Sequence, residues 1–332
     1  MRLPKFEYLE PEAVSEAVSL LEKYRGQCSV MAGGTDLLVA MKQRRQTPGY
    51  VLSLAKIPAL KEIREEGGML SIGPLATLEE VAASAAIREK LPLLSQAAWE
   101  VGSPLLRTVA TIGGNLCLDT RCRFYNQSEF WRGARPECHK AGGSTCHVTN
   151  KENVCYSTFS GDIAPALIAL NSQIRLNGKG GERVLPLADF YTGEGRAPNL
   201  LAAGGNEVLT EIKVPLPATG TGGTYRKYRF RESIDFPLVG LAALLRSDPG
   251  DGTCRDARLV ISGVGSRPLE AVEAGKKLVG KKLNPDIVAE AAETAAAEAR
   301  PVRTDRVGPQ FKKKMVRALV VEVISELGGI NR

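Results

Sequence analysis

Four of the chain's seven cysteines lie between residues 122 and 155, in a segment without sustained helical or strand periodicity. The chain's two histidines lie in the same segment, and each directly follows one of these cysteines. Such a concentration of soft ligands indicates a metal site or a disulfide framework. Because a long irregular segment inside a compact domain is usually functional, we take this one as a candidate site. Its residues are Cys122, Cys138, Cys146 and Cys155, with His139 and His147.

The length and composition of the chain bound its class. At 332 residues it exceeds one ordinary hydrophobic core, which predicts two domains. With 43% hydrophobic and 24% charged residues, it has the composition of a soluble globular protein. No apolar run approaches the ~20 residues that span a bilayer, and the N-terminus lacks a signal-peptide pattern. We therefore expect a cytoplasmic protein with no membrane association, where disulfides are rare and a metal site is favoured.

The net charge of +7 is modest, and its lysines occur in short scattered groups at 276–277, 281–282 and 312–314. No stripe of alternating basic and aromatic residues accompanies them. We interpret these groups as solvated helix faces and expect no nucleic-acid partner.

The pattern along the chain predicts an α+β fold in two parts. Residues 29–42 have the pattern of a strand, a glycine turn and a helix, and two helical stretches are expected at 78–94 and 93–102. A linker rich in proline and glycine follows at 215–223. Beyond it we expect strands and then helices, with strands at 223–230, 237–245 and 257–264 and helices at 269–279, 287–299 and 311–327.

Two glycine pairs, Gly33-Gly34 and Gly113-Gly114, each follow a strand-like run and adjoin a threonine. Such turns are often simply tight connections. They also let backbone N–H groups approach an anion at a helix start, so the two pairs together could clamp a pyrophosphate. Neither pair belongs to a G-x-G-x-x-G fingerprint or a Walker loop, so NAD in a Rossmann site and ATP are not indicated.

The four clustered cysteines are separated by 15, 7 and 8 residues. This is neither the C-x2-C knuckle of zinc ribbons nor the compact ferredoxin pattern. The spacing leaves open a structural zinc, an iron–sulfur cluster, or thiols without metal. We expect the other cysteines, Cys28, Cys117 and Cys254, to be buried free thiols. Two histidines give little general-base capacity, which argues against a hydrolase and for a chain that holds cofactors.

The glycine motifs resemble those of the medium, FAD-binding subunits of molybdenum hydroxylases, the family that includes the flavin modules of xanthine dehydrogenase and carbon monoxide dehydrogenase. Residues 30–37 are similar to the first FAD loop of that family, residues 111–115 to its second, T-I-G-G-N, and residues 160–165 to its aspartate segment. The resemblance covers essentially the whole chain. It implies an electron relay with no catalytic residue of its own and FAD contacts at Val30, Met31, Ala32, Gly33, Gly34, Thr35, Asp36, Leu37, Val101, Ala110, Thr111, Ile112, Gly113, Gly114, Asn115, Asp162, Leu209 and Lys227.

The resemblance also implies the domain organisation. A two-part FAD-binding domain of the PCMH type is expected at residues 1–217, with an insertion at about 119–157. A smaller α+β domain of the carbon monoxide dehydrogenase flavoprotein type is expected at 222–330.

The insertion departs from most of the family, because the segment between T-I-G-G-N and the aspartate is short in most members. Within the family, a four-cysteine insertion is typical of the 4-hydroxybenzoyl-CoA reductase β subunit, where it holds a [4Fe–4S] cluster. The resemblance therefore implies metal ligation by Cys122, Cys138, Cys146 and Cys155. It implies that electrons pass from reduced ferredoxin through this cluster to FAD, and onward for the reductive dehydroxylation of 4-hydroxybenzoyl-CoA to benzoyl-CoA.

The partners implied by the resemblance are a large subunit with molybdopterin and a small subunit with two [2Fe–2S] clusters, in a heterohexamer. Basic residues outnumber acidic ones in the insertion, and this surface is expected either to receive an acidic ferredoxin or merely to solubilise the loop. Two alternatives remain open. One is the FAD subunit of an oxidising hydroxylase, and the other is a flavin-free scaffold stabilised by zinc.

Overall fold

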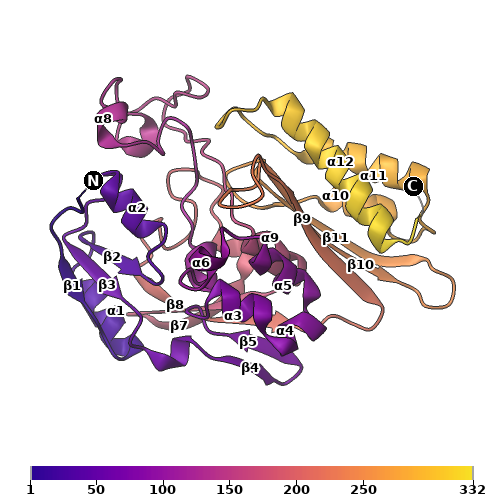
Figure 1. Ribbon diagram of the computed structural model, residues 1–332, viewed down its shortest axis with the longest axis horizontal. Coiled ribbons are helices and arrows are strands. Elements are labelled where there is room, and N and C mark those ends of the chain that lie inside the picture. The colour runs from indigo at the N-terminus through magenta and orange to yellow at the C-terminus, as the bar shows by residue number, and fades with distance from the viewer. Residues whose placement is uncertain (1, 331–332) are drawn as a thin grey trace.

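The computed structural model describes residues 2–330 and shows three β-sheets with helices packed around them (Figure 1). Helices and strands alternate irregularly, so the prediction of an α+β fold is confirmed. Within the described residues, no helix is both long and apolar enough to cross a bilayer.

The first sheet is parallel and has the order β1-β3-β2, with β1 at Glu7–Leu9, β2 at Cys28–Met31 and β3 at Tyr50–Ser53. Helix α1 (Val14–Lys23) packs its apolar face, which includes Ala17 and Leu21, on this sheet. The predicted strand, glycine turn and helix are confirmed as β2, the turn at 32–36 and α2 (Leu37–Lys42).

The second sheet is antiparallel and has the order β4-β5-β8-β6-β7. Its strands are β4 (Ile63–Glu66), β5 (Met69–Ile72), β6 (Gln173–Gly178), β7 (Gly181–Pro186) and β8 (Glu207–Pro215). Between β5 and β6 the chain forms the helices that cover the sheet, namely α3 (Leu78–Ala83), α4 (Ala85–Lys90), α5 (Pro92–Trp99), α6 (Pro104–Arg107), α7 (Ile112–Leu116) and α9 (Ile163–Ala169). Short 3-10 turns lie at Pro58–Leu60 and Leu187–Phe190.

Two helical predictions are corrected in this region. The first expected stretch, 78–94, is divided, because the Ser84 side chain accepts a hydrogen bond from the Ile87 N–H and so caps a new helix, α4. The second, expected from residue 93, begins at Pro92 as α5. The strand-like run expected before Gly113 is instead the end of α6 and a turn, because Thr111 caps α7 by accepting a hydrogen bond from the Gly114 N–H. T-I-G-G-N therefore begins a helix directly.

The third sheet is antiparallel and has the order β12-β11-β10-β9. Its strands are β9 (Thr221–Tyr228), β10 (Val239–Ser247), β11 (Cys254–Ser262) and β12 (Leu269–Glu270). Helices α10 (Val272–Leu278), α11 (Pro285–Glu298) and α12 (Pro309–Leu327) cover one face (Figure 1). The helix expected from residue 269 begins only at Val272, because Leu269 and Glu270 pair with β11 instead.

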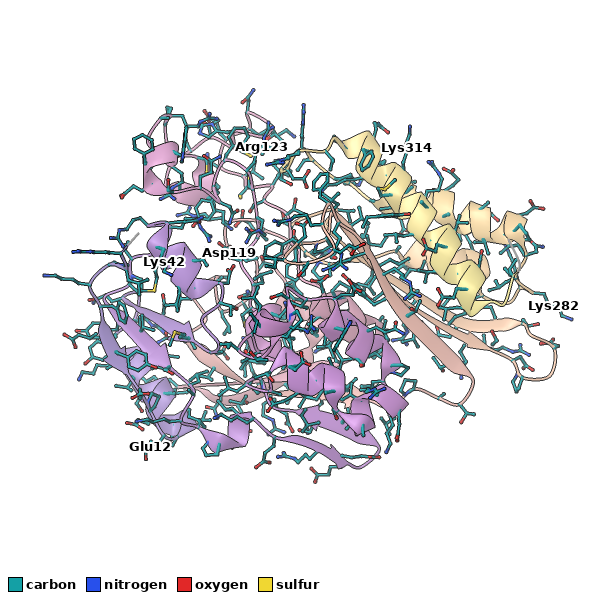
Figure 2. The ribbon with its side chains drawn as sticks, in the orientation of Figure 1. Glu12, Lys42, Asp119, Arg123, Lys282 and Lys314 are labelled. Atoms are coloured by element: carbon teal, nitrogen blue, oxygen red, sulfur yellow. The ribbon has the colours of Figure 1, made fainter. Side chains whose placement is uncertain are left out.

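The insert, residues 119–157, lies between α7 and α9 in the sequence and projects from the rest of the molecule (Figure 1). It contains one helical turn, α8 (Glu129–Arg132), and a 3-10 turn at His139–Ala141. An isolated bridge between Arg121 and Thr158 joins the two ends of the insert at its base. Figure 2 shows Asp119 at this base and Arg123 farther out.

Phe159 lies directly after the insert and packs in the main core. It is fully buried, and its ring meets that of Tyr191 edge-on at a centroid distance of 4.9 Å. We expect Phe159→Ala to lower the free energy of unfolding by about 3–5 kcal/mol, because it removes a buried ring and leaves a cavity. Urea denaturation of both proteins measures the difference.

The control is Phe130→Ala, since Phe130 lies in α8 with 81% of its surface exposed. We expect its free energy of unfolding to stay within about 0.5 kcal/mol of the parent. Equal losses in the two variants would contradict the placement of Phe159 in the core.

Candidate functional site

A cavity of about 740 Å³ opens between the first sheet, the helices of the second sheet and the loop before β10. Its volume is within the range of about 300–1,000 Å³ that is typical of cofactor pockets. All of the residues predicted to contact FAD line this cavity except Ile112 and Lys227. The structure thus brings the two glycine turns, Val101, Asp162 and Leu209 together from distant parts of the sequence.

The turn between β2 and α2 has the features of an anion cradle. A side chain at Gly33 has no room, because a Cβ there would lie 2.0 Å from the carbonyl oxygen of Val109. Gly34 has a φ of +72°, in the left-handed region that favours glycine. Within the described residues, the backbone N–H groups of Gly33, Gly34 and Thr35 have no hydrogen-bond partner. These N–H groups are free to bind phosphate oxygens.

The second glycine turn has a different role from the one expected. The Gly113 N–H donates to the carbonyl of Pro74 at 2.9 Å, and the Gly114 N–H donates to the Thr111 hydroxyl at 3.1 Å. A Cβ on Gly113 would lie 2.5 Å from that of Pro74. The prediction that both glycine pairs offer free N–H groups to an anion is therefore wrong for Gly113 and Gly114. Their small size instead lets α7 pack closely against the wall of the cavity.

Ile112 and Lys227 do not line the cavity. Ile112 is fully buried in the main core, because the start of α7 directs it toward the sheet. The Lys227 ammonium is buried behind the wall, 3.1 Å from the Asp162 carboxylate. It also donates hydrogen bonds to the carbonyls of Glu100 (2.7 Å) and Asp235 (3.2 Å).

Asp162 is the buried acid of the site. Its Oδ1 accepts a hydrogen bond from the Tyr225 hydroxyl at 2.7 Å in addition to the Lys227 contact. Burial raises the pKa of Asp162, and Lys227 and Tyr225 oppose this increase. Burial also raises the pKa of Tyr225 well above its ordinary value, so Tyr225 is a neutral donor.

Several lining residues were not predicted. The loop before β8 contributes Gly204, Gly205 and Asn206, a third glycine pair whose G-G-N pattern repeats that of residues 113–115. The loop before β10 contributes Ile234 and Phe236. Only the repeated G-G-N was visible in the sequence.

Arg121, in the insert, contacts two residues that line the cavity, Asp36 and Phe236. Its guanidinium lies 3.7 Å from the Asp36 carboxylate and 3.9 Å from the ring centre of Phe236. Burial raises the pKa of Asp36, and the charge of Arg121 opposes this.

The four cysteines of the insert line one small pocket together with His139, His147 and Lys140. None of the four forms a disulfide. In residues 2–330, no three or more His, Cys, Asp or Glu side chains are arranged so that they could hold a metal ion. Burial raises the pKa of Cys122 to about 11. Burial also raises the pKa of Cys146. Hydrogen bonds from the segment after it, including one from the Val148 N–H, outweigh this and lower the pKa of Cys146 overall.

Comparison with protein-family models matches residues 4–217 to the FAD binding domain in molybdopterin dehydrogenase. The chain therefore belongs to this family of FAD-binding proteins. Residues 223–327 match the CO dehydrogenase flavoprotein C-terminal domain, so the FAD-binding domain is followed by the same C-terminal domain as in carbon monoxide dehydrogenase flavoproteins.

Full-length relatives support this assignment. The chain is 29% identical to the carbon monoxide dehydrogenase medium chain of Hydrogenophaga pseudoflava, over 97% of this chain and 96% of that one. It is 30% identical to the aldehyde oxidoreductase FAD-binding subunit PaoB of Escherichia coli, over 81% and 85%. A solved structure of the Hydrogenophaga pseudoflava carbon monoxide dehydrogenase superposes with a TM-score of 0.82 at 28% identity, with full coverage of both chains. The predicted FAD-binding family and the predicted fold are confirmed.

The first glycine turn gives a direct test of the cavity. We expect Gly33→Ala to weaken FAD binding at least tenfold, about 1.4 kcal/mol, because the added Cβ displaces the turn from Val109. Flavin content after purification and a fluorescence titration of the apoprotein measure the effect. Gly180→Ala is the control, since a Cβ there meets nothing within 4 Å, and full flavin binding by both variants would contradict the assignment.

The buried pair gives a second test. We expect Lys227→Met to lower the free energy of unfolding by about 3–5 kcal/mol, because Asp162 loses its buried counter-charge. Lys282→Met, at an exposed lysine, is the control and should change the free energy by less than about 0.5 kcal/mol. Urea denaturation at neutral pH measures both.

The effect of Lys227→Met should depend on pH. Because burial raises the pKa of Asp162, the folded protein holds this proton more tightly than the unfolded chain does. The stability contributed by Asp162 is present below the unfolded value of about 3.9 and is lost as the pH rises through the folded value. Removing Lys227 raises the pKa of Asp162 further, so the deficit of the variant should be larger at pH 8 than at pH 5. An equal deficit at both values would contradict this account.

Proposed function

We propose that this chain is the FAD-carrying medium subunit of a multi-subunit molybdenum enzyme, and that its insert adds a [4Fe–4S] cluster. The observation that supports the cluster is the convergence of Cys122, Cys138, Cys146 and Cys155 on one pocket. The proposed domains are 1–217, with the insert at 119–157, and 222–330. FAD, when bound, exchanges one or two electrons with neighbouring centres, and the residues of this chain bind and orient it.

The donor set of the pocket suits an iron–sulfur cluster. Four thiolates are the usual ligands of a [4Fe–4S] centre, and hydrogen bonds to the sulfurs tune it. The hydrogen bonds that lower the pKa of Cys146 come from backbone N–H groups and the Thr149 side chain. Zinc is the alternative occupant, since the Nδ1 of His139 is buried in the same pocket without a partner in the described part of the chain.

The proposed partners follow from the relatives. The Hydrogenophaga pseudoflava and Escherichia coli proteins are a medium chain and an FAD-binding subunit, which supports a large molybdopterin subunit and a small [2Fe–2S] subunit for this chain as well. We propose a heterohexamer.

Two directions of electron flow are proposed for the complex. The four-cysteine insert supports 4-hydroxybenzoyl-CoA reduction, with reduced ferredoxin as the donor to the cluster. The relatives support the opposite direction, because they include carbon monoxide dehydrogenase, nicotinate dehydrogenase and nicotine 6-hydroxylase components. The comparisons favour this oxidising alternative. Benzoyl-CoA formed by the purified complex from 4-hydroxybenzoyl-CoA and reduced ferredoxin would support the reductase, and its absence would favour the oxidising enzyme.

Metal analysis tests the cluster. We expect about four iron and four acid-labile sulfide per chain, because that is the composition of the proposed cluster. Cys138→Ser should abolish the [4Fe–4S] signal in electron paramagnetic resonance, while flavin content and the signals of the small subunit's [2Fe–2S] clusters stay unchanged. Cys254→Ser, at a buried cysteine of β11, is the control and should retain both. Zinc without iron or sulfide would overturn the cluster.

A further inference from the structure

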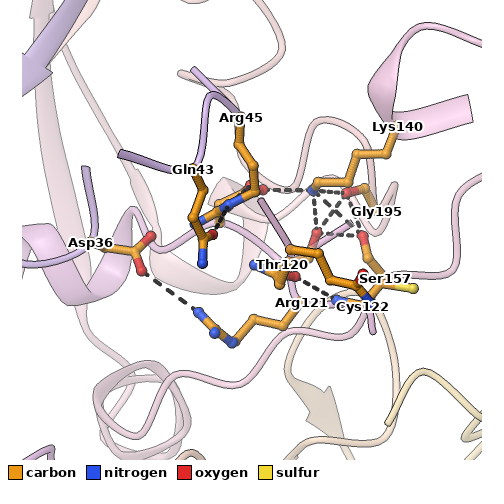
Figure 3. Close-up of polar contacts among 12 residues, drawn as sticks. Asp36, Gln43, Arg45, Thr120, Arg121, Cys122, Lys140, Ser157 and Gly195 are labelled. Carbon is orange, nitrogen blue, oxygen red and sulfur yellow. Dashed lines mark hydrogen bonds and ion pairs between the residues drawn. The ribbon is translucent and has the colours of Figure 1, made fainter. Parts of the chain in front are cut away.

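Lys140 lies in the wall between the cysteine pocket and the cavity. It belongs to the 3-10 turn at His139–Ala141, and only 3% of its side chain is exposed. Its Nζ donates hydrogen bonds to Thr120 Oγ1 (2.7 Å) and the Gly195 carbonyl (2.6 Å), as Figure 3 shows, and to Asp119 Oδ1 (2.6 Å). Three acceptors satisfy all three protons of the ammonium, so Lys140 is a charged group held in one position.

On the side of the cysteines, this network reaches a proposed ligand. The hydroxyl of Ser157 lies 3.1 Å from the Sγ of Cys155 and 2.6 Å from the hydroxyl of Thr120. Lys140 Nζ lies 3.5 Å from the same Ser157 oxygen, and both residues line the cysteine pocket. The ammonium is therefore one side chain away from the sulfur.

On the other side, the network reaches the cavity. Asp119 lines the cavity and does not line the cysteine pocket, and its second oxygen lies 3.8 Å from Arg45. The Lys140–Asp119 pair is thus an oriented dipole. Its positive end faces the cysteines and its negative end faces the site of the flavin.

We propose that Lys140 is a positioning residue whose buried charge raises the reduction potential of the cluster in the cysteine pocket. This inference rests on the proposed function, since it requires that cluster. Reduction adds one negative charge to an iron–sulfur centre, and a nearby cation in a low-dielectric wall stabilises the reduced form. Asp119 holds the cation in place and partly offsets its field.

The experiment compares midpoint potentials of the cluster in the complete complex by redox titration monitored with electron paramagnetic resonance. Lys140→Met should make reduction about tenfold less favourable, which is a shift of about 59 mV to lower potential for one electron. Lys140→Arg keeps the charge and should stay near the parent. Asp119→Asn should shift the potential upward, because it removes the offsetting negative charge.

The control is Lys151→Met, which removes the same charge from an exposed position of the insert. Its potential should not change, since solvent screens that charge. A merely structural bridge would be broken equally by Lys140→Met and Asp119→Asn, so shifts of the same sign in both variants would overturn the inference. Equal shifts in Lys140→Met and Lys151→Met would overturn it as well.

Iron and sulfide contents separate the possible failures. A parent complex whose iron and sulfide do not exceed the amount in the two [2Fe–2S] clusters of the small subunit would overturn the proposed cluster and this inference with it. Parent protein with the cluster, but with unshifted potentials in the variants, would overturn this inference alone. If Lys140→Met fails to retain iron, Asp119→Asn decides, because a higher potential supports the inference and an equal or lower one overturns it.

Discussion

The cavity depends on one buried ammonium group, that of Lys227 in β9. Its Nζ contacts Asp162 at the start of α9 and the carbonyls of Glu100 and Asp235. Asp162 and Asp235 line the cavity, and Glu100 precedes Val101, which also lines it. Because a buried cation is costly unless it is fully paired, these three segments are held together around it. Lys227 therefore shapes the cavity without lining it, and through it the C-terminal part of the chain contributes to the proposed FAD site.

The insert is also fixed to the rest of the molecule. The hydroxyl groups of Thr158 and Thr304 lie 2.6 Å apart, and the Arg123 N–H donates to the Thr304 carbonyl at 2.7 Å. These contacts join the insert, and Thr158 directly after it, to the segment before α12. Its arrangement of cysteines thus depends on both parts of the fold, although the insert has little regular secondary structure of its own.

The parts of the site that could be predicted are those where local sterics dictate the residue. Gly33 is required because Val109 leaves no space for a Cβ, and such a constraint leaves a recognisable motif. Lys227 was predicted to contact the cofactor, but its ammonium contacts Asp162 behind the cavity wall, since only the tertiary structure shows which side of a wall a side chain occupies. The loop at 204–206 repeats the G-G-N pattern of residues 113–115, but only the tertiary structure shows that it lines the same cavity. The boundary between helices near Pro92 was predicted at 93–94, whereas the break at Ser84 lies inside a longer apolar pattern that obscured its local cap signal.

The wall between the two proposed redox sites is polar, yet it is satisfied internally. Thr120, Ser157 and Lys140 share the Gly195 carbonyl as an acceptor, and Lys140 adds Asp119. A buried polar network is rigid only when its members find partners within it, whereas an unsatisfied one admits water or rearranges. Gly195 is required there, because a Cβ would lie 2.7 Å from both the Cys155 carbonyl and the Ser157 hydroxyl. Close packing and complete hydrogen bonding therefore keep the wall fixed, so a charge placed in it, such as that of Lys140, acts on its neighbours from a constant position.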